Sequence, residues 1–487
     1  NIFGFAFNAP GDVVAGYQKY DRSNMNFNLA FSTLLAKVHS FKVGGELQSY
    51  TIRNYSLGNE GAFALAGLFA NLAPGQTQED VLINRGVNNY GYDVFGNEYT
   101  GDDPVDKAHQ PLFAAFYIQD KMEFKDLIIN AGLRFDYIDI DNMMPIDPTQ
   151  PELTFDKSTG KVKDGGLVEV PTFSSVSPRL GFSFPVTDKT IFHAQYGKFV
   201  QQSRLRDVYQ GYYATSSNIG GGFYIPAPVG FNVRPTRTTQ YEIGFTQQIG
   251  EIASFDITGY YKDIQDQVLF DQINTQTTSA YGSYFVLQNG DFATTKGLEL
   301  TFNLRRYQRF SANASLAYQD AKGTGSYPNS NRGIVGAPLD GVTVFSPQYI
   351  SPLEYNNKFR GNVNVDYRFA ADDGGPILQQ LGLSALLTFA SGHPYTRGIG
   401  GADLEGDARD RQPVESLNSS TTPSTFQIDL RVDKTFNITD KLNLNVYFYV
   451  INLLDALNIQ NVFLRTGSTN DDGYLSDPTL GGQLIER

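Results

Sequence analysis

The chain has 487 residues, a net charge of −13 and no cysteine. The acidic balance argues against nucleic acid as a partner, because nucleic-acid binding needs a basic surface. The absence of cysteine excludes disulfides, thiolate metal sites and a cysteine nucleophile. The longest largely apolar run, residues 62–70, is far shorter than the roughly twenty residues that a transmembrane helix needs.

Apolar and polar residues alternate in long runs along the chain. This pattern predicts extended strands, because successive side chains of a strand point to opposite faces. In the pair of runs over residues 296–319, for example, Leu298 and Leu300 alternate with Glu299 and Thr301. Such pairs predict antiparallel hairpins. Short polar turns separate the two runs of each pair near residues 38, 124, 187, 249, 307, 373 and 438.

The segments between one hairpin and the next are much longer and rich in Gly, Pro, Asn, Asp and Tyr. They cover residues 57–110, 142–172, 204–236, 270–292, 322–356, 394–424 and 454 to the end. Soluble domains rarely contain so many long loops, whereas outer-membrane barrels combine short periplasmic turns with long extracellular loops. For one hairpin taken alone, a half-exposed sheet of a soluble protein is the favoured interpretation. The repetition favours an all-β fold, an antiparallel transmembrane β-barrel.

Five motifs follow one another along the chain. They are Phe116–Tyr137 (FYIQDKMEFKDLIINAGLRFDY), Ser177–Gln201 (SPRLGFSFPVTDKTIFHAQYGKFVQ), Val233–Gly244 (VRPTRTTQYEIG), Asn289–Thr301 (NGDFATTKGLELT) and Ile451–Leu454 (INLL). Together they resemble, in family order, the barrel of TonB-dependent outer-membrane receptors, especially the Oar-like group.

The resemblance implies a barrel of 22 strands, of which about fourteen are visible in the sequence. It also implies an N-terminal plug domain, a TonB box and a last strand, none of which this sequence contains. Residues 1–487 are therefore expected to form one partial transmembrane β-barrel domain with long extracellular loops. The expected structure is an open curved sheet with two unpaired edges and no plug.

The function that the resemblance implies is energy-coupled uptake of a nutrient through the outer membrane of a Gram-negative bacterium. The expected partners are outer-membrane lipid, TonB through the absent N-terminal region, and an unknown small ligand, peptide or glycan. Two alternatives stay open: an adhesin or secretion-associated barrel, and a passive porin. The upstream part of the gene would discriminate among them.

The loop over residues 204–231 is the best ligand candidate. Arginine binds carboxylate or phosphate, and aromatic rings stack on apolar or sugar faces. Loop packing and a membrane-interface belt are the alternatives for the aromatic residues. The candidate ligand-binding residues are Arg204, Arg206, Tyr209, Tyr212, Tyr213, Phe223 and Tyr224.

Charged residues on the polar side of the strands are expected to face the lumen. For Glu242 and Glu299, pairing with barrel cations or with a plug is favoured over direct contact with substrate. The candidate lumen-facing residues are Arg134, Asp136, Glu242, Glu299, Arg360, Asp366 and Arg431.

The sequence contains no catalytic motif that would predict an enzyme. The four histidines are scattered without a zinc-binding spacing, and neither a nucleophile elbow nor a P-loop occurs. The acidic segments 401–410 and 470–477 lack the EF-hand spacing, so solvated turns are favoured there over a Ca²⁺ site. No metal site and no cofactor are predicted.

Overall fold

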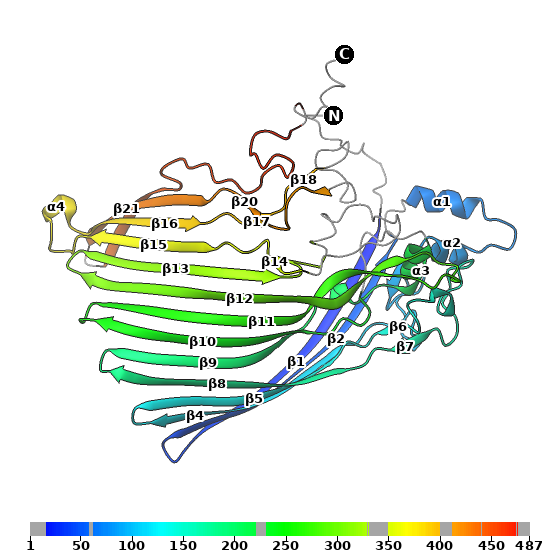
Figure 1. Cartoon of the computed structure of the whole chain (residues 1–487), viewed down its shortest axis with the longest axis horizontal. Coiled ribbons are helices and arrows are strands. Elements are labelled where there is room, and N and C mark those ends of the chain that lie inside the picture. The colour runs from blue at the N-terminus through cyan, green and yellow to red at the C-terminus, as the bar shows by residue number, and fades with distance from the viewer. Residues whose placement is uncertain are drawn as a thin grey trace.

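The computed structural model describes residues 16–57, 62–220, 230–328, 330, 349–399, 412–439, 441–473 and 475. Most of them form one antiparallel sheet, here called the wall, whose strands follow one another in chain order (Figure 1). The strands of the wall are β1 (Gln18–Leu35), β2 (His39–Ser56), β4 (Leu112–Phe124), β5 (Leu127–Asp139), β8 (Phe173–Thr187), β9 (Thr190–Gln201), β10 (Thr236–Ile249), β11 (Ala253–Ile273), β12 (Tyr284–Tyr307), β13 (Phe310–Gly323), β15 (Phe359–Arg368), β16 (Leu381–Ala390), β21 (Thr425–Thr439) and β22 (Leu442–Val450). The antiparallel β architecture predicted from the alternation is confirmed.

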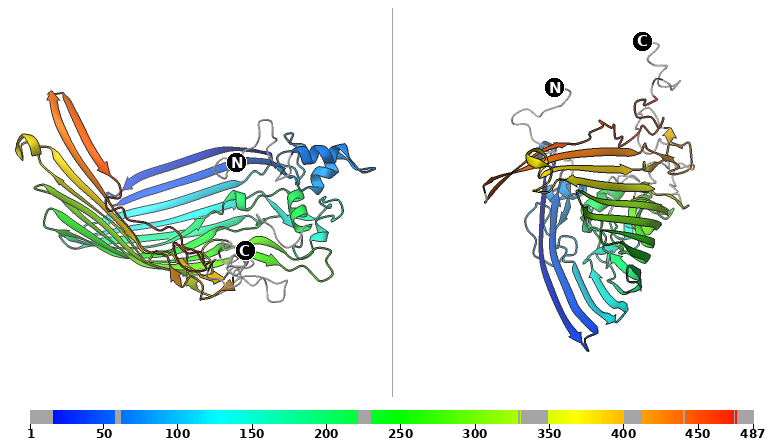
Figure 2. Two further views of the ribbon diagram at one scale, coloured as in Figure 1. Left: turned by 90° about the horizontal axis from the view of Figure 1, so that it is seen from above. Right: turned by 90° about the vertical axis from the view of Figure 1, so that its left-hand side faces the viewer.

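The wall curves into an open trough, with β1 and β2 at one edge and β21 and β22 at the other (Figure 2). Within the described residues, β1 pairs with β2 and β22 pairs with β21, and neither has a second neighbour in the sheet. The arrangement agrees with the expected open curved sheet. The total of 22 strands and the absence of a plug and a last strand stay predictions.

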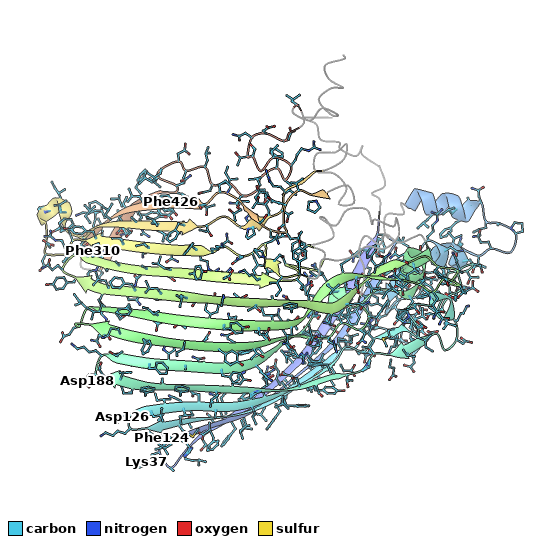
Figure 3. All side chains as sticks on the ribbon, viewed as in Figure 1. Lys37, Phe124, Asp126, Asp188, Phe310 and Phe426 are labelled. Atoms are coloured by element: carbon cyan, nitrogen blue, oxygen red, sulfur yellow. The ribbon has the colours of Figure 1, made fainter. Side chains whose placement is uncertain are left out.

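The short turns lie together at one end of the trough, opposite the helices α1–α3. Figure 3 labels Lys37, Asp126 and Asp188 in three of these turns. In the first turn Ala36 and Lys37 both have positive φ, 50° and 60°. Two successive residues of this conformation form the kind of tight turn whose twist matches that of the flanking strands. The turn therefore fixes the register of β1 on β2, which pairs Leu35 with His39.

The opposite end, here called the loop end, carries most of the remaining elements. The helices and 3₁₀ turns of the described residues are α1 (Ala62–Ala70), α2 (Gln78–Asn84), η1 (Pro151–Leu153), η2 (Leu205–Asp207), α3 (Tyr212–Gly220) and, at the end of the short turns, α4 (Gly375–Leu378). The short strands are β3 (Asn88–Tyr90), β6 (Met143–Pro145), β7 (Leu167–Glu169), β14 (Ser351–Pro352), β17 (Pro394–Tyr395), β18 (Gly398–Ile399), β19 (Gln412–Pro413) and β20 (Ser420–Thr421). In the described part of the chain, none of the helices has the length and apolar character needed to cross a membrane.

The two faces of the wall differ in polarity. On β1, Met25, Phe27 and Leu29 expose 66%, 60% and 66% of their surface on one face, while asparagines occupy the positions between them. The apolar face continues across β8, β9 and β10, where the ring of Phe192 lies 5.2 Å from that of Phe184 and 5.1 Å from that of Phe245. An exposed apolar surface of this extent is unusual for a protein in water. It is typical of the outer surface of a membrane barrel.

A hydrophobic cluster at the loop end, here called the loop core, covers the upper part of the polar face. On β5, Arg134 and Asp136 are followed on the same face by Ile138, which is 8% exposed. The loop core is built by long-range packing of several loops onto β2 and β5. Its buried residues are Ile52, Tyr90, Ile138, Ile140, Val170, Val208, Tyr209 and Val233.

The hairpin of β11 and β12 extends past the other strands and bends toward the loop end (Figure 1). The bend coincides with a bulge at residues 264–268, where Asp266 adopts a left-handed conformation with φ 59°. The Asp266 carboxylate accepts a hydrogen bond of 2.6 Å from Arg237 Nε. Bulges locally increase strand twist, so this one re-aims the upper half of the hairpin.

Candidate functional site

A cavity of about 740 Å³ lies between the wall and the loop at residues 202–206. We call it the loop-side cavity. Strands β1, β2, β4 and β5 supply its floor and one side, and the segment that ends in η2 supplies its rim. Its polar and aromatic lining residues are Tyr20, Arg22, Glu46, Gln48, Tyr50, Phe113, Arg134, Asp136, Tyr137, Gln202, Arg204 and Arg206.

The floor of the loop-side cavity is a ladder of polar contacts across two strands. Tyr50 Oη donates to Gln48 Oε1 at 3.0 Å, and the Gln48 amide in turn donates to the Glu46 carboxylate. Arg134 reaches both acidic groups: its NH2 lies 3.6 Å from Glu46 Oε2, and its Nε donates to Asp136 Oδ1 at 2.7 Å. Both floor carboxylates are therefore partnered by the same guanidinium.

The rim of the loop-side cavity carries three further arginines. Arg204 Nε lies 2.9 Å from Asp207 Oδ2, and Arg206 Nε lies 3.6 Å from the other oxygen of the same carboxylate. The Arg204 and Arg206 side chains are 61% and 75% exposed. Arg22 enters from β1 and lies over the Tyr50 ring, with 4.7 Å between its Cζ and the ring centroid. The rim is thus more positively charged than the floor.

The structure places the tyrosines of the predicted ligand loop differently from the two arginines. Tyr209 is buried in the loop core and donates to the Ile140 carbonyl oxygen at 2.5 Å. Tyr212 is buried as well and donates to the Met143 carbonyl oxygen at 3.1 Å, and Tyr213 packs against the hydrophobic cluster around α2. A buried ring offers no surface to a ligand, so Tyr209 and Tyr212 pack in the loop end and their predicted role in ligand binding stays a prediction. Phe223 and Tyr224 lie outside the described residues.

Two titratable groups lie near the loop core, His109 buried and Asp106 half-buried, and burial shifts the pKa of each in the direction that favours the neutral form. Burial lowers the pKa of His109 to about 4, against the opposing effect of the Asp141 carbonyl oxygen that lies 2.9 Å from its Nδ1. Burial raises the pKa of Asp106 to about 6, although Asn89 Nδ2 donates to this carboxylate at 2.7 Å. Neither environment could be predicted from the sequence, because both residues lie in a segment predicted to be a loop.

A second concave region of about 610 Å³ lies on the polar face of β4, β5, β8, β9 and β10. We call it the wall hollow. Gly132, Gly181 and Gly197 form its bottom, and a Cβ added to Gly181 would meet nothing nearer than Gln195 Cγ at 3.6 Å. Amides and charged groups surround the glycines: Gln119, Asn130, Arg134, Arg179, His193, Gln195, Gln240 and Glu242. Sequence reasoning missed this site, although glycines at polar-face positions of three successive strands are a readable signal.

Arg134 lines both the loop-side cavity and the wall hollow, so the two regions adjoin at this residue. The structure also places the other candidate lumen residues. Asp136 lies in the loop-side cavity and Glu242 in the wall hollow. Glu299 and Arg360 share one face of the wall, since both pair with Ala317 in the sheet.

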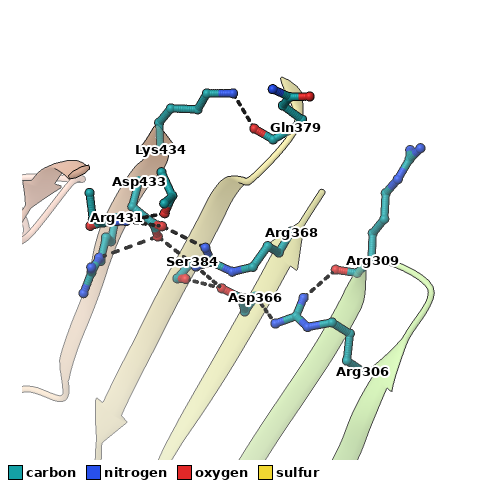
Figure 4. A network of polar contacts seen from close by, with 11 residues as sticks. Arg306, Arg309, Asp366, Arg368, Gln379, Ser384, Arg431, Asp433 and Lys434 are labelled. Carbon is teal, nitrogen blue, oxygen red and sulfur yellow. Dashed lines mark hydrogen bonds and ion pairs between the residues drawn. The ribbon is translucent and has the colours of Figure 1, made fainter. Parts of the chain in front are cut away.

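Asp366 and Arg431 belong to an ionic network near the end of the short turns (Figure 4). Arg306 contacts Asp366, whose carboxylate also accepts a hydrogen bond of 2.5 Å from Ser384 Oγ. Arg368 donates two hydrogen bonds of 2.8 Å to Asp433, which is 3% exposed and has Arg431 at 3.7 Å. The network cross-links strands that are two apart in the wall, because Arg306 on β12 contacts Asp366 on β15 and Arg368 on β15 contacts Asp433 on β21.

The acidic segments offer little further information on metal binding. In the part of the chain that the structure describes, no group of three or more His, Asp or Glu side chains is arranged to hold a metal ion. Residues 401–410 lie outside that part. In the second acidic segment, Asp471 Oδ1 accepts a hydrogen bond from the Gly473 amide, as in an ordinary turn.

A wall that is apolar on one face and polar on the other, with short turns at one end and long loops at the other, defines a transmembrane β-barrel of the outer-membrane type. The chain belongs to the TonB dependent receptor-like, beta-barrel family, whose profile matches residues 3–453. The protein is therefore located in the outer membrane of a Gram-negative bacterium, and the apolar face of the wall meets lipid. The Oar-like subgroup stays a prediction.

Solved structures of outer-membrane transporters share this fold. The outer membrane transporter YddB from Escherichia coli aligns with a TM-score of 0.55 and 14% identity, over 90% of this chain and 51% of that one. The copper transporter OprC aligns with a TM-score of 0.50 and 14% identity, over 91% of this chain and 52% of that one. The chain thus spans about half the length of these two transporters. The comparison with curated proteins found no match.

Proposed function

We propose that the protein is a receptor and transporter that takes up a nutrient ligand by energy-coupled passage through a plugged barrel. Family membership supports outer-membrane transport in general. The observation that carries the proposal is that the loop-side cavity and the wall hollow adjoin at Arg134. Together they form a polar route from the loop end into the trough. The partner that supplies energy would be TonB, acting through an N-terminal region.

In this proposal the polar face of the wall lines the lumen. The route then begins among Arg204, Arg206 and Arg134 and continues past Glu242. Ligand binds first in the loop-side cavity and moves to the wall hollow when the plug rearranges. No bond is made or broken in the ligand, so the protein acts as a binding and transport protein rather than as an enzyme. The remaining residues assigned to the lumen are Asp136, Glu299, Arg360, Asp366 and Arg431.

The test compares uptake in a deletion strain carrying the full-length gene or a variant. Gly181→Tyr should abolish uptake, because its ring fills the wall hollow while its Cβ makes only ordinary contacts, with Gln195 Cγ at 3.6 Å and the Ala194 carbonyl oxygen at 3.7 Å. Gly259→Tyr is the matched control: Gly259 pairs with Leu298 and Ile243 on the apolar face, so uptake should persist. Growth on a panel of limiting nutrients identifies the ligand, and labelled ligand then measures the rate.

An uncoupler of the inner-membrane proton gradient separates this function from its alternatives. Energy-coupled uptake should stop when the gradient collapses. Uptake that continues at an unchanged rate would contradict the proposal and indicate a passive porin. A deletion strain with normal growth on every nutrient but with lost adhesion or secretion would contradict it in favour of the other class of barrel.

A further inference from the structure

We propose that the loop-side cavity recognises an anionic group of its ligand, a carboxylate or a phosphate, through Arg22 and Arg206. The proposal rests on the function proposed above, since it names the chemical class that this cavity selects. It is carried by the distribution of charge around the cavity rather than by the fold.

The carboxylates of the cavity floor are already engaged. Arg134 lies between Glu46 and Asp136 and contacts both, and Glu46 also accepts from the Gln48 amide. An incoming cation would have to displace Arg134 from these contacts. The floor is therefore a poor site for a positively charged ligand.

Arg22 keeps its hydrogen-bonding edge available. Its guanidinium lies over the Tyr50 ring at the distance of a cation–π contact, with 4.7 Å from Cζ to the ring centroid. No carboxylate of the described residues lies within ion-pair distance of it. A ring contact uses no carboxylate, so the N–H groups of Arg22 can still pair with the two oxygens of a carboxylate or phosphate.

Arg206 is only partly neutralised. Asp207 is the acidic group nearest to it, at 3.6 Å, and the same carboxylate holds Arg204 at 2.9 Å. One negative charge thus serves two guanidiniums on the rim. With its side chain 75% exposed, Arg206 can turn toward a ligand in the cavity.

The negative charge of the chain means that an anion is attracted at the rim of the loop-side cavity but not by the molecule as a whole. A net charge of −13 repels anions at long range, but this repulsion is screened within about 10 Å at ordinary ionic strength. Inside the cavity the nearest charges decide, and at the rim they are guanidiniums. An anion is therefore favoured at the rim of the loop-side cavity over the remaining surface.

The experiment measures electrostatic potential with a cysteine in the full-length protein in isolated outer membranes. Residues 1–487 contain no cysteine, and any cysteine elsewhere in the full-length protein is first replaced by serine, so that Gln202→Cys gives a single reactive thiol at the rim. Its reaction rates are compared for two methanethiosulfonate reagents, the anionic sulfonatoethyl and the cationic trimethylammonioethyl compound. Gln195→Cys in the wall hollow is the matched control, since it also replaces a glutamine.

The ratio of anionic to cationic rate at Gln202→Cys should fall on the order of tenfold in the Arg22→Gln/Arg206→Gln background, because two nearby positive charges are removed. The ratio at Gln195→Cys should not change. Arg22→Lys/Arg206→Lys should retain the ratio at the rim, which separates loss of charge from misfolding. An unchanged ratio in the glutamine background would overturn the proposal, and this outcome does not depend on any transport assay.

Protection by small probes then tests binding. Propane-1,2,3-tricarboxylate or inorganic phosphate should slow labelling of Gln202→Cys. The probe that slows labelling shows whether the cavity prefers a carboxylate or a phosphate. The uncharged propane-1,2,3-tricarboxamide has the same skeleton and should not protect. Equal protection by the amide and the carboxylate would overturn the proposal, as would the absence of protection by both anions. Anion protection in a parent protein that shows no energy-coupled uptake would instead contradict only the transport function.

Discussion

His109 and Tyr209 stack at the centre of the loop core, with 4.0 Å between ring centroids and 8° between ring planes. His109 is buried, and burial lowers its pKa from 6.5 to about 4. The folded loop core therefore holds the neutral imidazole, while the unfolded loop takes up a proton below pH 6.5. It follows that the stability contributed by His109 is complete above its unfolded pKa and is lost as the pH falls from 6.5 to about 4.

We expect the loop core to be less stable at pH 5 than at pH 7, by about 2 kcal/mol for the His109 contribution. Hydrogen exchange at the Ile52 amide, which donates to the His109 carbonyl oxygen at 2.9 Å, reports this change. His109→Gln should remove this part of the pH dependence. A variant with the same pH dependence as the parent protein would disprove the role of His109.

Asp106 requires its own control, because its pKa is raised on folding whereas the pKa of His109 is lowered. Its folded-state pKa is raised to about 6 from 3.8. Its contribution is therefore present at low pH and is lost as the pH rises between these two values. Asp106→Asn should make the acid sensitivity of the loop core steeper, since it removes the compensating group. The two single variants and the double variant separate the two contributions.

Val363 and Asn364 are neighbours on β15 that belong to opposite faces of the wall. Val363 pairs with Ala314 and Leu387, and Asn364 pairs with Asn313 and Leu386. We expect Val363→Arg to lower the free energy of unfolding in lipid by roughly 2–4 kcal/mol, because it places a charge on the lipid-facing surface. Asn364→Arg should be tolerated. Refolding into lipid vesicles with denaturant titration measures both, and equal losses would invert the assignment of the faces.

At the level of elements, the bend in β11 and β12 depends on one residue. Asp266 is left-handed and accepts hydrogen bonds from Arg237 Nε at 2.6 Å and Arg234 NH2 at 3.4 Å. Its carbonyl oxygen also accepts from Asn289 Nδ2 at 2.8 Å. A bulge, two cations and a cross-strand amide thus meet at one point.

Asp266→Ala should loosen the upper hairpin, because alanine is disfavoured in the left-handed region by about 1–2 kcal/mol and both ion pairs are lost. Asp266→Asn is the matched variant, since asparagine tolerates this conformation and loses only the charge. Faster hydrogen exchange in residues 267–273 and 284–289 of the alanine variant is the expected result. If both variants exchange at the rate of the parent protein, the bend is held by other contacts.

The elements of the wall could be predicted from the sequence because alternation is a local property. The short turns and the strands that flank them follow directly from it. The predicted loops 57–110 and 204–236 nevertheless contain α1, α2 and α3. For α2 a signal existed: Thr77 and Asp80 form a capping box, in which Thr77 Oγ1 accepts from the Asp80 amide at 3.1 Å.

Of the candidate site, only the charged residues could be predicted from the sequence. Arg204, Arg206, Arg134 and Asp136 were selected for their chemistry, but nothing in the sequence joined the first two to the last two. Their meeting in one cavity depends on how the loop after β9 folds back over β5, which is a long-range contact. The burial of Tyr209 depends on the same packing, and a tyrosine in a polar loop carries no local mark of burial.

For the whole molecule, the arrangement of turns and loops predicts a topology across the membrane. Gly220, at the end of α3, is exposed and has open space around the position of a Cβ. Asp188 lies in the short turn between β8 and β9 at the other end of the trough (Figure 3). A cysteine at Gly220 should react with a membrane-impermeant reagent on intact cells. A cysteine at Asp188 should react only after the outer membrane is opened.

Permeabilised cells supply the control, since both thiols should label there to a similar extent. The topology would be reversed if the cysteine at Asp188 labels on intact cells and the one at Gly220 does not. Residues 1–487 contain no cysteine, and labelling of the parent protein without an introduced cysteine measures the background.

The polarity of the inner face changes along β2 and β5. The inner face is polar near the short turns and apolar near the loop end. Glu46 and Gln48 on β2 face water-accessible space, whereas Ile52, two positions further up the same face, is 1% exposed among apolar neighbours. The kind of side chain that can be substituted on this face, polar or apolar, therefore reverses within one strand. In the half near the short turns, a residue on the polar face must be hydrophilic, as in a water-filled channel. In the half near the loop end, a residue on the same face must be hydrophobic, as in the core of a soluble protein. The loop-side cavity lies at the height where this requirement reverses, since Glu46 and Gln48 line it and Ile52 belongs to the loop core.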